Sequence, residues 1–203
     1  WINSGTEVRF PVNMEGKERS IYVDGEIYIE VAKDKERPFY VHTSGFDVRV
    51  YGTKFNVTSY KADKEKSVVL VEGSVSVCSK EETKEKEVKE IFLHPDQMYH
   101  TTNRGPMITH VNALQYITWK DGIWQFTSES LESIALRLSR YYGVDIHCDE
   151  KTAVKSCTGK LILFDDVDKT LRIIEEIFGV RYETNQLSLI HISEPTRLRR
   201  ISY

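Results

Sequence analysis

Glu26 and Glu30 are the first residues in the sequence whose types and spacing suit a chemical reaction. They lie four positions apart in "GEIYIEV", and this even offset places both on one face of a strand. Most glycoside hydrolases use a pair of carboxylates for catalysis. Tyr28 lies between them on the same face, which fits a solvent-exposed strand face equally well, and we favour that simpler interpretation.

A second group of candidate residues lies in "LHPDQMYH", where His94, Asp96 and His100 offer the side chains of a metal site. No helical or hairpin spacing aligns the two histidines. We therefore expect solvated loop residues at these positions and predict no metal.

The three cysteines, Cys78, Cys148 and Cys157, do not form a CxxC pair, so a zinc ribbon or a thioredoxin motif has no support. Cys148 and Cys157 flank a short connection, which leaves open a disulfide or two ordinary thiols, the simpler alternative. The chain also contains no HExxH, GxSxG, P-loop or GxGxxG motif. We predict no catalytic residue and no cofactor, and hence a protein that is not an enzyme.

The composition describes a globular chain of one or two domains. Of its 203 residues, 40% are hydrophobic and 29% are charged, and the formal net charge is -3 without a basic stripe, which argues against nucleic-acid binding. No segment approaches the roughly 20 apolar residues that cross a bilayer. The chain opens on "WINSGTEVRFP" without an initiator Met or a signal sequence, so we expect a fragment with any targeting or anchoring segment upstream of Trp1.

The candidate residues in the first half of the chain, such as Glu26 and Glu30, lie in segments that are predicted to be strands or the loops between them. Residues 1–111 alternate apolar and polar side chains between turn residues such as Asp24-Gly25, Ser44-Gly45 and Glu72-Gly73, and no amphipathic helix competes. This pattern predicts a mainly β domain, either a sandwich or an irregular β-helix. Residues 79–90, a mixed-charge run, predict a solvated hairpin tip or loop.

One glycine interrupts this alternation in "FDVRVYGTKFNV". Val50 and Phe55 are five positions apart, so a flat strand would point them to opposite faces. A bulge or tight corner at Gly52 lets both point inward. A backbone anion nest at Gly52, Thr53 and Lys54 is the functional alternative, and we favour the architectural one.

Helices appear only after a predicted linker, residues 112–119. Residues 120–186 predict a small α+β domain in which a strand-helix-strand unit occurs twice, with both helices packed on a sheet. Ser128 is the predicted N-cap of the first helix, and Gly143 and Gly179 supply the left-handed stops. The two units align at a spacing of 36 positions, and the matched pairs are Leu131 and Val167, Ala135 and Leu171, Leu138 and Ile174, Tyr142 and Phe178, Gly143 and Gly179, and Val144 and Val180.

The last segment departs from this pattern. "LSLIHISEPTR" resembles the translation of a sequencing adapter, so we predict that residues 187–203 are a non-native tail. The native chain would then have continued into a final strand, and its loss would leave a sheet edge unpaired.

The first domain resembles the FecR family of anti-sigma factors. The resemblance is carried by "WINSGTEVRFP", by "GEIYIEVAKDKERPFYVHTSGFDVRVYGTKFNVTSY" and by "VLVEGSVSV", and Asp96 stands where the family usually has the Gly of a Pro-Gly turn. "WKDGIWQF", "LESIALRLSRYYGVDI" and "LRIIEEIFGVRYE" are similar to the C-terminal domain that accompanies FecR in Bacteroidetes. That domain in turn is similar to the short signalling domain of secretins and TonB-dependent receptors.

This resemblance implies the periplasmic part of an inner-membrane protein. In the family, a cytoplasmic helical domain holds an ECF sigma factor, a single transmembrane helix follows, and the periplasmic region receives a signal from an outer-membrane TonB-dependent transporter. Release of the sigma factor generally follows through regulated proteolysis. The chain would lack the sigma-binding and membrane parts, and we expect its partner-binding residues within 120–186, with docking by strand addition.

An alternative remains from the residues themselves. The 11 tyrosines and the carboxylates of Glu26 and Glu30 also fit a secreted or surface protein that binds carbohydrate or processes glycosides. Packing of amphipathic strands explains many tyrosines equally well.

Overall fold

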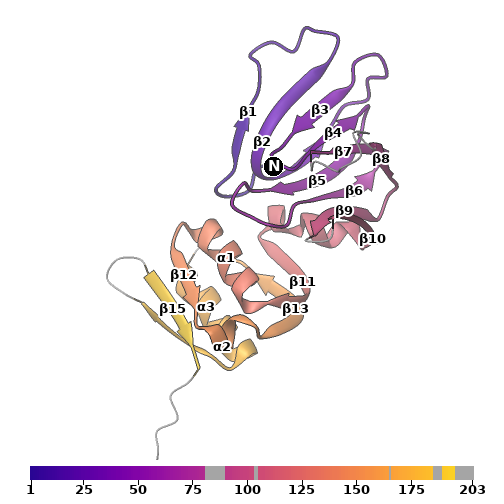
Figure 1. Ribbon diagram of the computed structural model, residues 1–203. Helices are drawn as coiled ribbons and strands as arrows, with labels where there is room; N and C mark the ends of the chain where they lie inside the picture. Colours follow the sequence, from indigo (N-terminus) through magenta and orange to yellow (C-terminus); the bar gives the residue numbers. More distant parts are fainter. Residues whose placement is uncertain (81–89, 103–104, 165, 185–188, 195–203) are drawn as a thin grey trace, which may run out of the picture. The chain divides into compact units, whose positions relative to one another are not determined.

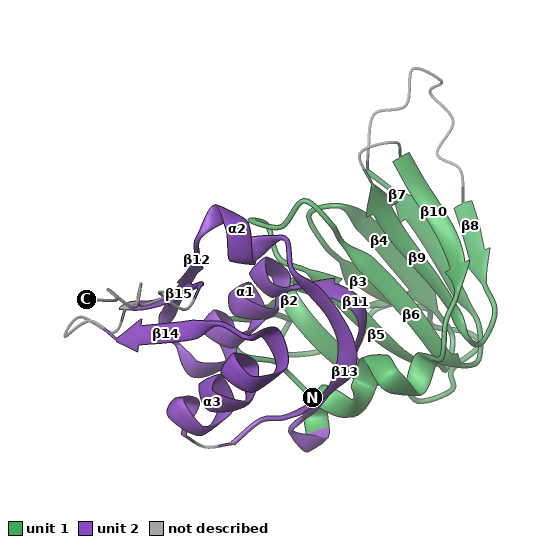
Figure 2. Ribbon diagram, turned by 90° about the horizontal axis from the view of Figure 1, so that it is seen from below, with its two compact units in different colours: residues 1–120 green, residues 121–203 purple. Residues whose placement is uncertain are grey.

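The computed structural model describes residues 1–80, 90–102, 105–164, 166–184 and 189–194. The chain divides into two compact units, residues 1–120 and residues 121–203 (Figures 1 and 2). The first is mainly β and the second is a small α+β unit, which confirms the predicted fold class. Most of the mixed-charge run at 79–90 lies outside the described residues.

Within its described residues, the first unit contains ten strands and one 3₁₀ helix. Alternation of apolar and polar residues favours strands. The elements are β1 (Glu7–Arg9), β2 (Arg19–Glu30), β3 (Phe39–His42), β4 (Phe46–Val50), β5 (Lys54–Ser59), β6 (Ser67–Glu72), β7 (Val75–Ser79), β8 (Glu90–Leu93), β9 (Gln97–Thr102), β10 (Gly105–His110) and η1 (Ala113–Asp121). Eight of these described strands contain buried residues, whereas β1 and β10 contain none.

These strands form one sheet that folds back on itself through β2. Residues 25–30 of β2 pair with β5, and β6, β9 and β10 follow; we call this the β5 half. Residues 19–24 of β2 pair with β1 and β3, and β4, β7 and β8 follow; we call this the β4 half. The inner faces share one core, in which Phe46 of β4 meets Tyr99 of β9 edge to face with ring centroids 5.4 Å apart. The halves therefore face each other as in a sandwich.

The chain passes between the halves at residues with positive φ. The hairpins β3–β4, β5–β6, β7–β8 and β9–β10 alternate between the two halves, and a corner joins each hairpin to the next. Left-handed backbone favours glycine, and aspartate tolerates it better than most residues do. The corner residues, with the one inside β2, are Gly25 (φ 142°), Gly52 (143°), Gly73 (99°) and Asp96 (61°).

Gly52 is one of these corners. Val50 and Phe55 on either side of it are both buried, which confirms that the interruption restores their inward facing. By contrast, the predicted turn at Asp24-Gly25 is wrong, because β2 continues through it. The pair marks the point where β2 changes its partners from the β4 half to the β5 half.

The described part of the second unit contains two long helices between two small sheets. Helical spacing of apolar residues gives each long helix a buried stripe, as predicted. The elements are β11 (Ile123–Ser130), α1 (Leu131–Tyr142), β12 (Asp145–Cys148), α2 (Glu150–Ala153), β13 (Ser156–Ile162), α3 (Val167–Phe178), β14 (Arg181–Thr184) and β15 (Leu189–Ser193).

The duplicated strands separate into different sheets, whereas a single sheet was predicted. The first strands of the two repeats, β11 and β13, pair with each other, and the second strands, β12 and β14, flank β15. Strand β15 is parallel to β12 and antiparallel to β14, and it buries Ile190 and Ile192. Within the described residues, the place between β12 and β14 is thus filled by a segment of the predicted non-native tail.

The helix ends follow the expected capping rules with one correction. Gly143 and Gly179 end α1 and α3 in left-handed conformation, as predicted. The N-cap of α1 is Ser130, which accepts from the Ser133 N–H at 3.2 Å, and not Ser128. Ser128 instead lies in a bulge of β11 with φ 51°, because β11 runs farther than its sequence pattern suggests.

No described helix combines the length and the apolarity needed to cross a bilayer.

Candidate interaction surface

The carboxylate of Glu26 is a structural group inside the first unit. It is 7% exposed and accepts from Asn3 Nδ2 at 2.7 Å, Asn56 Nδ2 at 3.0 Å and Thr58 Oγ1 at 3.1 Å. Asn56 Oδ1 in turn accepts from the Trp119 indole at 3.1 Å. The expectation of a solvated strand face is wrong at this position, because the N-terminal segment pairs with β2 and Asn3 covers the carboxylate.

Glu30 lies in a different environment from Glu26. It is exposed and accepts from the Tyr28 hydroxyl at 3.0 Å. Burial of the phenol, with the hydrogen bond to Glu30 and its charge, raises the pKa of Tyr28 to about 12. The two carboxylates have different partners and different exposure, which argues against a shared role in glycoside chemistry.

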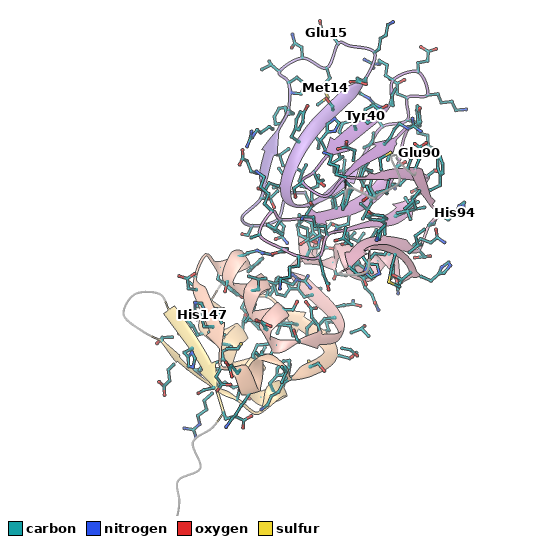
Figure 3. All side chains as sticks on the ribbon, in the orientation of Figure 1. Met14, Glu15, Tyr40, Glu90, His94 and His147 are labelled. Carbon is teal, nitrogen blue, oxygen red and sulfur yellow. The ribbon has the colours of Figure 1, made fainter. Side chains whose placement is uncertain are left out.

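The candidate metal ligands do not converge, and the expectation of a loop is wrong for His100, which lies in strand β9. His94 lies at the outer edge of the first unit (Figure 3), and its backbone N–H donates to Gln97 Oε1. Asp96 Oδ1 accepts from the Ala113 N–H at 3.0 Å and so fixes the start of η1. In the part of the chain that the structure describes, no three His, Cys, Asp or Glu side chains form a group that could hold a metal.

The segment Gly52–Lys54 is also used by the fold. Thr53 is buried and donates from Oγ1 to the Ser74 carbonyl at 2.9 Å, and Lys54 pairs with Glu72 at 2.9 Å. These contacts hold the corner in place, which favours the architectural interpretation over an anion nest.

The three cysteines carry free thiols. Cys148 is half-buried in the second unit, and burial, with the nearby charges of Glu132 and Asp149, raises the pKa of its thiol to about 11. A thiol with so little thiolate at neutral pH is a poor nucleophile, which argues against a catalytic role for it.

Partner binding by strand addition would use the strand edges of the second unit, and two of these edges are capped. The Ile146 N–H of β12 donates to Ser139 Oγ of α1 at 3.0 Å. The Tyr182 N–H of β14 donates to Glu175 Oε1 of α3 at 3.1 Å. Both the acceptors and the donors are 36 positions apart, so the duplicated units cap their second strands at equivalent positions. These caps occupy N–H groups that an added strand would need.

Strand β13 has the longest regular edge. It pairs with β11 alone among the described strands, and the Leu163 N–H donates to the Gly122 carbonyl at 2.8 Å. Because hydrogen-bonding direction alternates along an antiparallel pair, the backbone groups of Lys160 and Ile162 point away from β11. The Ile162 side chain is also 52% exposed.

The edge of β11 is less suitable than that of β13. A bulge between Phe126 and Glu129 interrupts its register, and the Ser128 N–H there donates to Thr158 Oγ1 at 2.8 Å. Bulges bend a strand and so discourage edge pairing. We call Ser156–Ile162 the β13 edge and take it as the candidate interaction surface.

Sequence reasoning placed partner binding within 120–186 but did not single out the β13 edge. The missing information was which strands are central and which backbone groups helix side chains cap. Only the repeat spacing carried a signal, since Ser139 and Glu175 occupy matching positions of the two units.

Comparisons with known proteins agree with this architecture. The model of the FecR protein family matches residues 1–76, and the model of the FecR C-terminal domain matches residues 123–190. No curated protein matches the chain by sequence.

Solved structures extend the likeness to nearly the whole chain. Two crystal structures, both described as a "putative anti-sigma factor" from Parabacteroides distasonis, are 25% identical to the chain and superpose with TM-scores of 0.84 and 0.83. Each comparison covers 96% of this chain and 89% of that chain.

Membership of this family also bears on chemistry, partners and location. FecR-family proteins are not enzymes, and their signalling generally involves sigma factors and TonB-dependent receptors. The FecR domain is a periplasmic domain. The chain belongs to the FecR family of anti-sigma factors and joins a FecR domain to a FecR C-terminal domain.

Proposed function

We propose that this chain is the periplasmic sensor part of an inner-membrane anti-sigma factor. It receives a signal by protein contact from an outer-membrane TonB-dependent transporter and relays it toward an ECF sigma factor. Two family matches in sequence order support the proposal, as does the likeness to the Parabacteroides structures. The sigma factor would be held by a cytoplasmic domain of the same protein, beyond this chain.

The domain organisation belongs to the same proposal. Residues 1–111 form the FecR-like sensor, residues 112–119 link it onward, and residues 120–186 form the signalling-type domain. Residues 187–203 are a non-native tail in this proposal, and β15 then stands in for the native last strand. A strand at this place needs apolar residues at alternate positions, which Ile190 and Ile192 supply.

The docking step of this proposal rests on the open backbone groups of the β13 edge. Its outward N–H and C=O groups at Lys160 and Ile162 can pair with a strand of the transporter's signalling domain, while the edges of β12 and β14 have their caps. In this mode main-chain hydrogen bonds supply affinity, and the exposed Ile162 supplies an apolar contact.

A proline at position 160 tests this docking mode. Lys160→Pro removes an outward N–H and leaves the ladder to β11 in place, because edge strands accept proline at such positions. We expect the affinity for the signalling domain of the cognate transporter, measured by calorimetric titration, to fall by at least about tenfold. Lys160→Ala, which keeps the N–H, should bind within about twofold of the unaltered chain.

The matched control places a proline on the other strand of the same sheet. Gln125 of β11 also directs its N–H outward, since its neighbour Trp124 pairs with Leu161 toward β13. Gln125→Pro should leave binding unchanged. Loss of binding in Gln125→Pro with normal binding in Lys160→Pro would place the contact on β11, and no binding by the unaltered chain would refute the relay itself.

A further inference from the structure

The first unit contains a cavity that the docking proposal does not use. Its volume is about 620 Å³, and it opens on the outer side of the β4 half beside β1, β2 and β3. This size falls within the range typical of small-molecule sites. The residues that bear on its chemistry are Arg9, Phe10, Tyr22, Asp24, His42 and Lys61.

Aromatic rings form one wall of this cavity. The Tyr22 ring is 57% exposed, and its centroid lies 4.8 Å from that of His42 at an interplanar angle of 28°. His42 also stacks on Tyr40, with centroids 5.9 Å apart and rings 3° from parallel, and its Nδ1 lies 2.9 Å from Asp47 Oδ1. Tyr40 lies on β3 in the first unit (Figure 3). The stack holds Tyr22 in place from one side and leaves much of its surface open.

Phe10 adds a second ring from the segment after β1. It lines the same cavity, and its side chain is 65% exposed. Large aromatic rings left this exposed give up the free energy that burial would supply. Two of them in one concavity indicate a surface that is covered when a ligand binds.

The charged side chains of the cavity already form ion pairs with one another or with neighbouring residues. Lys61 Nζ lies 3.2 Å from Asp24 Oδ2, Lys80 Nζ lies 2.7 Å from Asp47 Oδ1, and Arg9 pairs with Glu7. A charged ligand would compete with these pairs. Ammonium and guanidinium groups have more N–H donors than one ion pair uses, and carboxylates keep further lone pairs, so the site offers donors and acceptors without a net field.

We propose that this cavity binds a short neutral saccharide. The C–H faces of a sugar ring stack on exposed aromatic rings. Its hydroxyl groups can accept hydrogen bonds from the ammonium and guanidinium groups around Tyr22 and donate hydrogen bonds to the carboxylates. The proposal concerns the first unit alone. It adds a ligand input to the sensor and is independent of the β13 edge in the second unit.

The test is a titration of the chain with a panel of neutral oligosaccharides. The panel contains α- and β-linked glucans, xylans, mannans and N-acetylated amino-sugar oligomers, so that plant, storage and cell-wall sources are distinguished. We expect at least one class to bind at millimolar concentration or below in calorimetry. Tyr22→Ala and Phe10→Ala should each weaken that binding by at least about tenfold, whereas Tyr22→Phe keeps the ring and should retain it.

Phe92→Ala is the matched control, because Phe92 is 56% exposed on β8 and does not line the cavity. It should bind as the unaltered chain does, and the melting temperature of each variant shows that it is folded. No binding across the panel at millimolar concentration would overturn the proposal, as would binding that survives both Tyr22→Ala and Phe10→Ala. Loss of transporter-domain binding in Tyr22→Ala, without any saccharide binding, would make the surface a protein contact instead.

Discussion

Glu26 and Tyr28 show how two polar side chains of one strand acquire different roles. Glu26 ties β2 to the N-terminal segment and to β5, and through Asn56 to Trp119 of η1. Tyr28 is almost fully buried and donates to the exposed Glu30. Charge on Glu30 is tolerated because water reaches it, whereas charge on Tyr28 would be desolvated and would lie beside a carboxylate.

The raised pKa of Tyr28 predicts a loss of stability in alkali. The phenol has a pKa of 10.0 in the unfolded chain and about 12 in the folded one. Its contribution is therefore fully present below pH 10 and is lost as the pH rises toward about 12. We expect the difference in unfolding free energy between the unaltered chain and Tyr28→Phe to shrink over this interval, as measured by urea titration at a series of pH values.

The control for this experiment is Tyr51→Phe, which removes the same hydroxyl from a side chain that is 44% exposed. It shows how much the loss of a phenol hydroxyl from a largely exposed side chain changes the unfolding free energy at each pH. A constant difference for Tyr28→Phe across the interval would contradict the assignment of this alkaline loss to Tyr28.

At the scale of elements, sharp corners direct the chain in the first unit, and side-chain caps close strand edges in the second. The hairpins of the first unit alternate between its two halves, so the chain must turn sharply after every second strand. In the second unit, helix side chains at repeat-equivalent positions close the edges of β12 and β14. A corner shifts the phase of the side-chain alternation, as at Gly52, whereas a cap leaves it unchanged. Together they decide where each strand goes and which edge stays open.

Gly52 allows a prediction about these corners. A Cβ at position 52 would lie 2.6 Å from the Lys33 Cα, and the backbone there has φ 143°, which residues other than glycine rarely adopt. Gly143 has φ 66°, and a Cβ there would meet nothing within 4 Å. We expect Gly52→Ala to lower the unfolding free energy of its unit by about 3 kcal/mol and Gly143→Ala by about 1 kcal/mol, because only the first adds a clash to the backbone strain. Urea unfolding measures both, and equal losses would show that the close approach to Lys33 is unimportant.

At the scale of the whole molecule, each unit has its own apolar core. The strands of the first unit share one cluster of buried residues, and the second unit buries the stripes of α1 and α3 against its own strands. Two separate cores suit a protein whose two units contact different molecules, as the proposed relay requires.

Matched leucines test this independence. Leu70 of β6 and Leu138 of α1 are both fully buried, one in each unit. Leu70→Ala and Leu138→Ala should each cost about 2–5 kcal/mol, but each should lower the temperature of only one of two calorimetric transitions. One cooperative transition that both variants shift equally would show that the units unfold together.

Much of this molecule is determined by local sequence. Alternating side chains made the first domain β, helical spacing and terminal glycines bounded α1 and α3, and the broken alternation at Gly52 located a corner. The FecR resemblance was also visible in the residues alone. These features are local because each depends on which side chains share a face over a few neighbouring positions.

Tertiary structure decided which strands meet. The sequence does not reveal that β2 passes through Gly25 to serve both halves, that Glu26 is covered, or that β11 and β13 leave the sheet of β12 and β14. Strand partners and edge caps depend on segments far apart in the chain, such as Asn3 on Glu26 and Glu175 on Tyr182. A strand presents the same alternation to any partner, so only packing of the whole chain selects the pairings and leaves the β13 edge open.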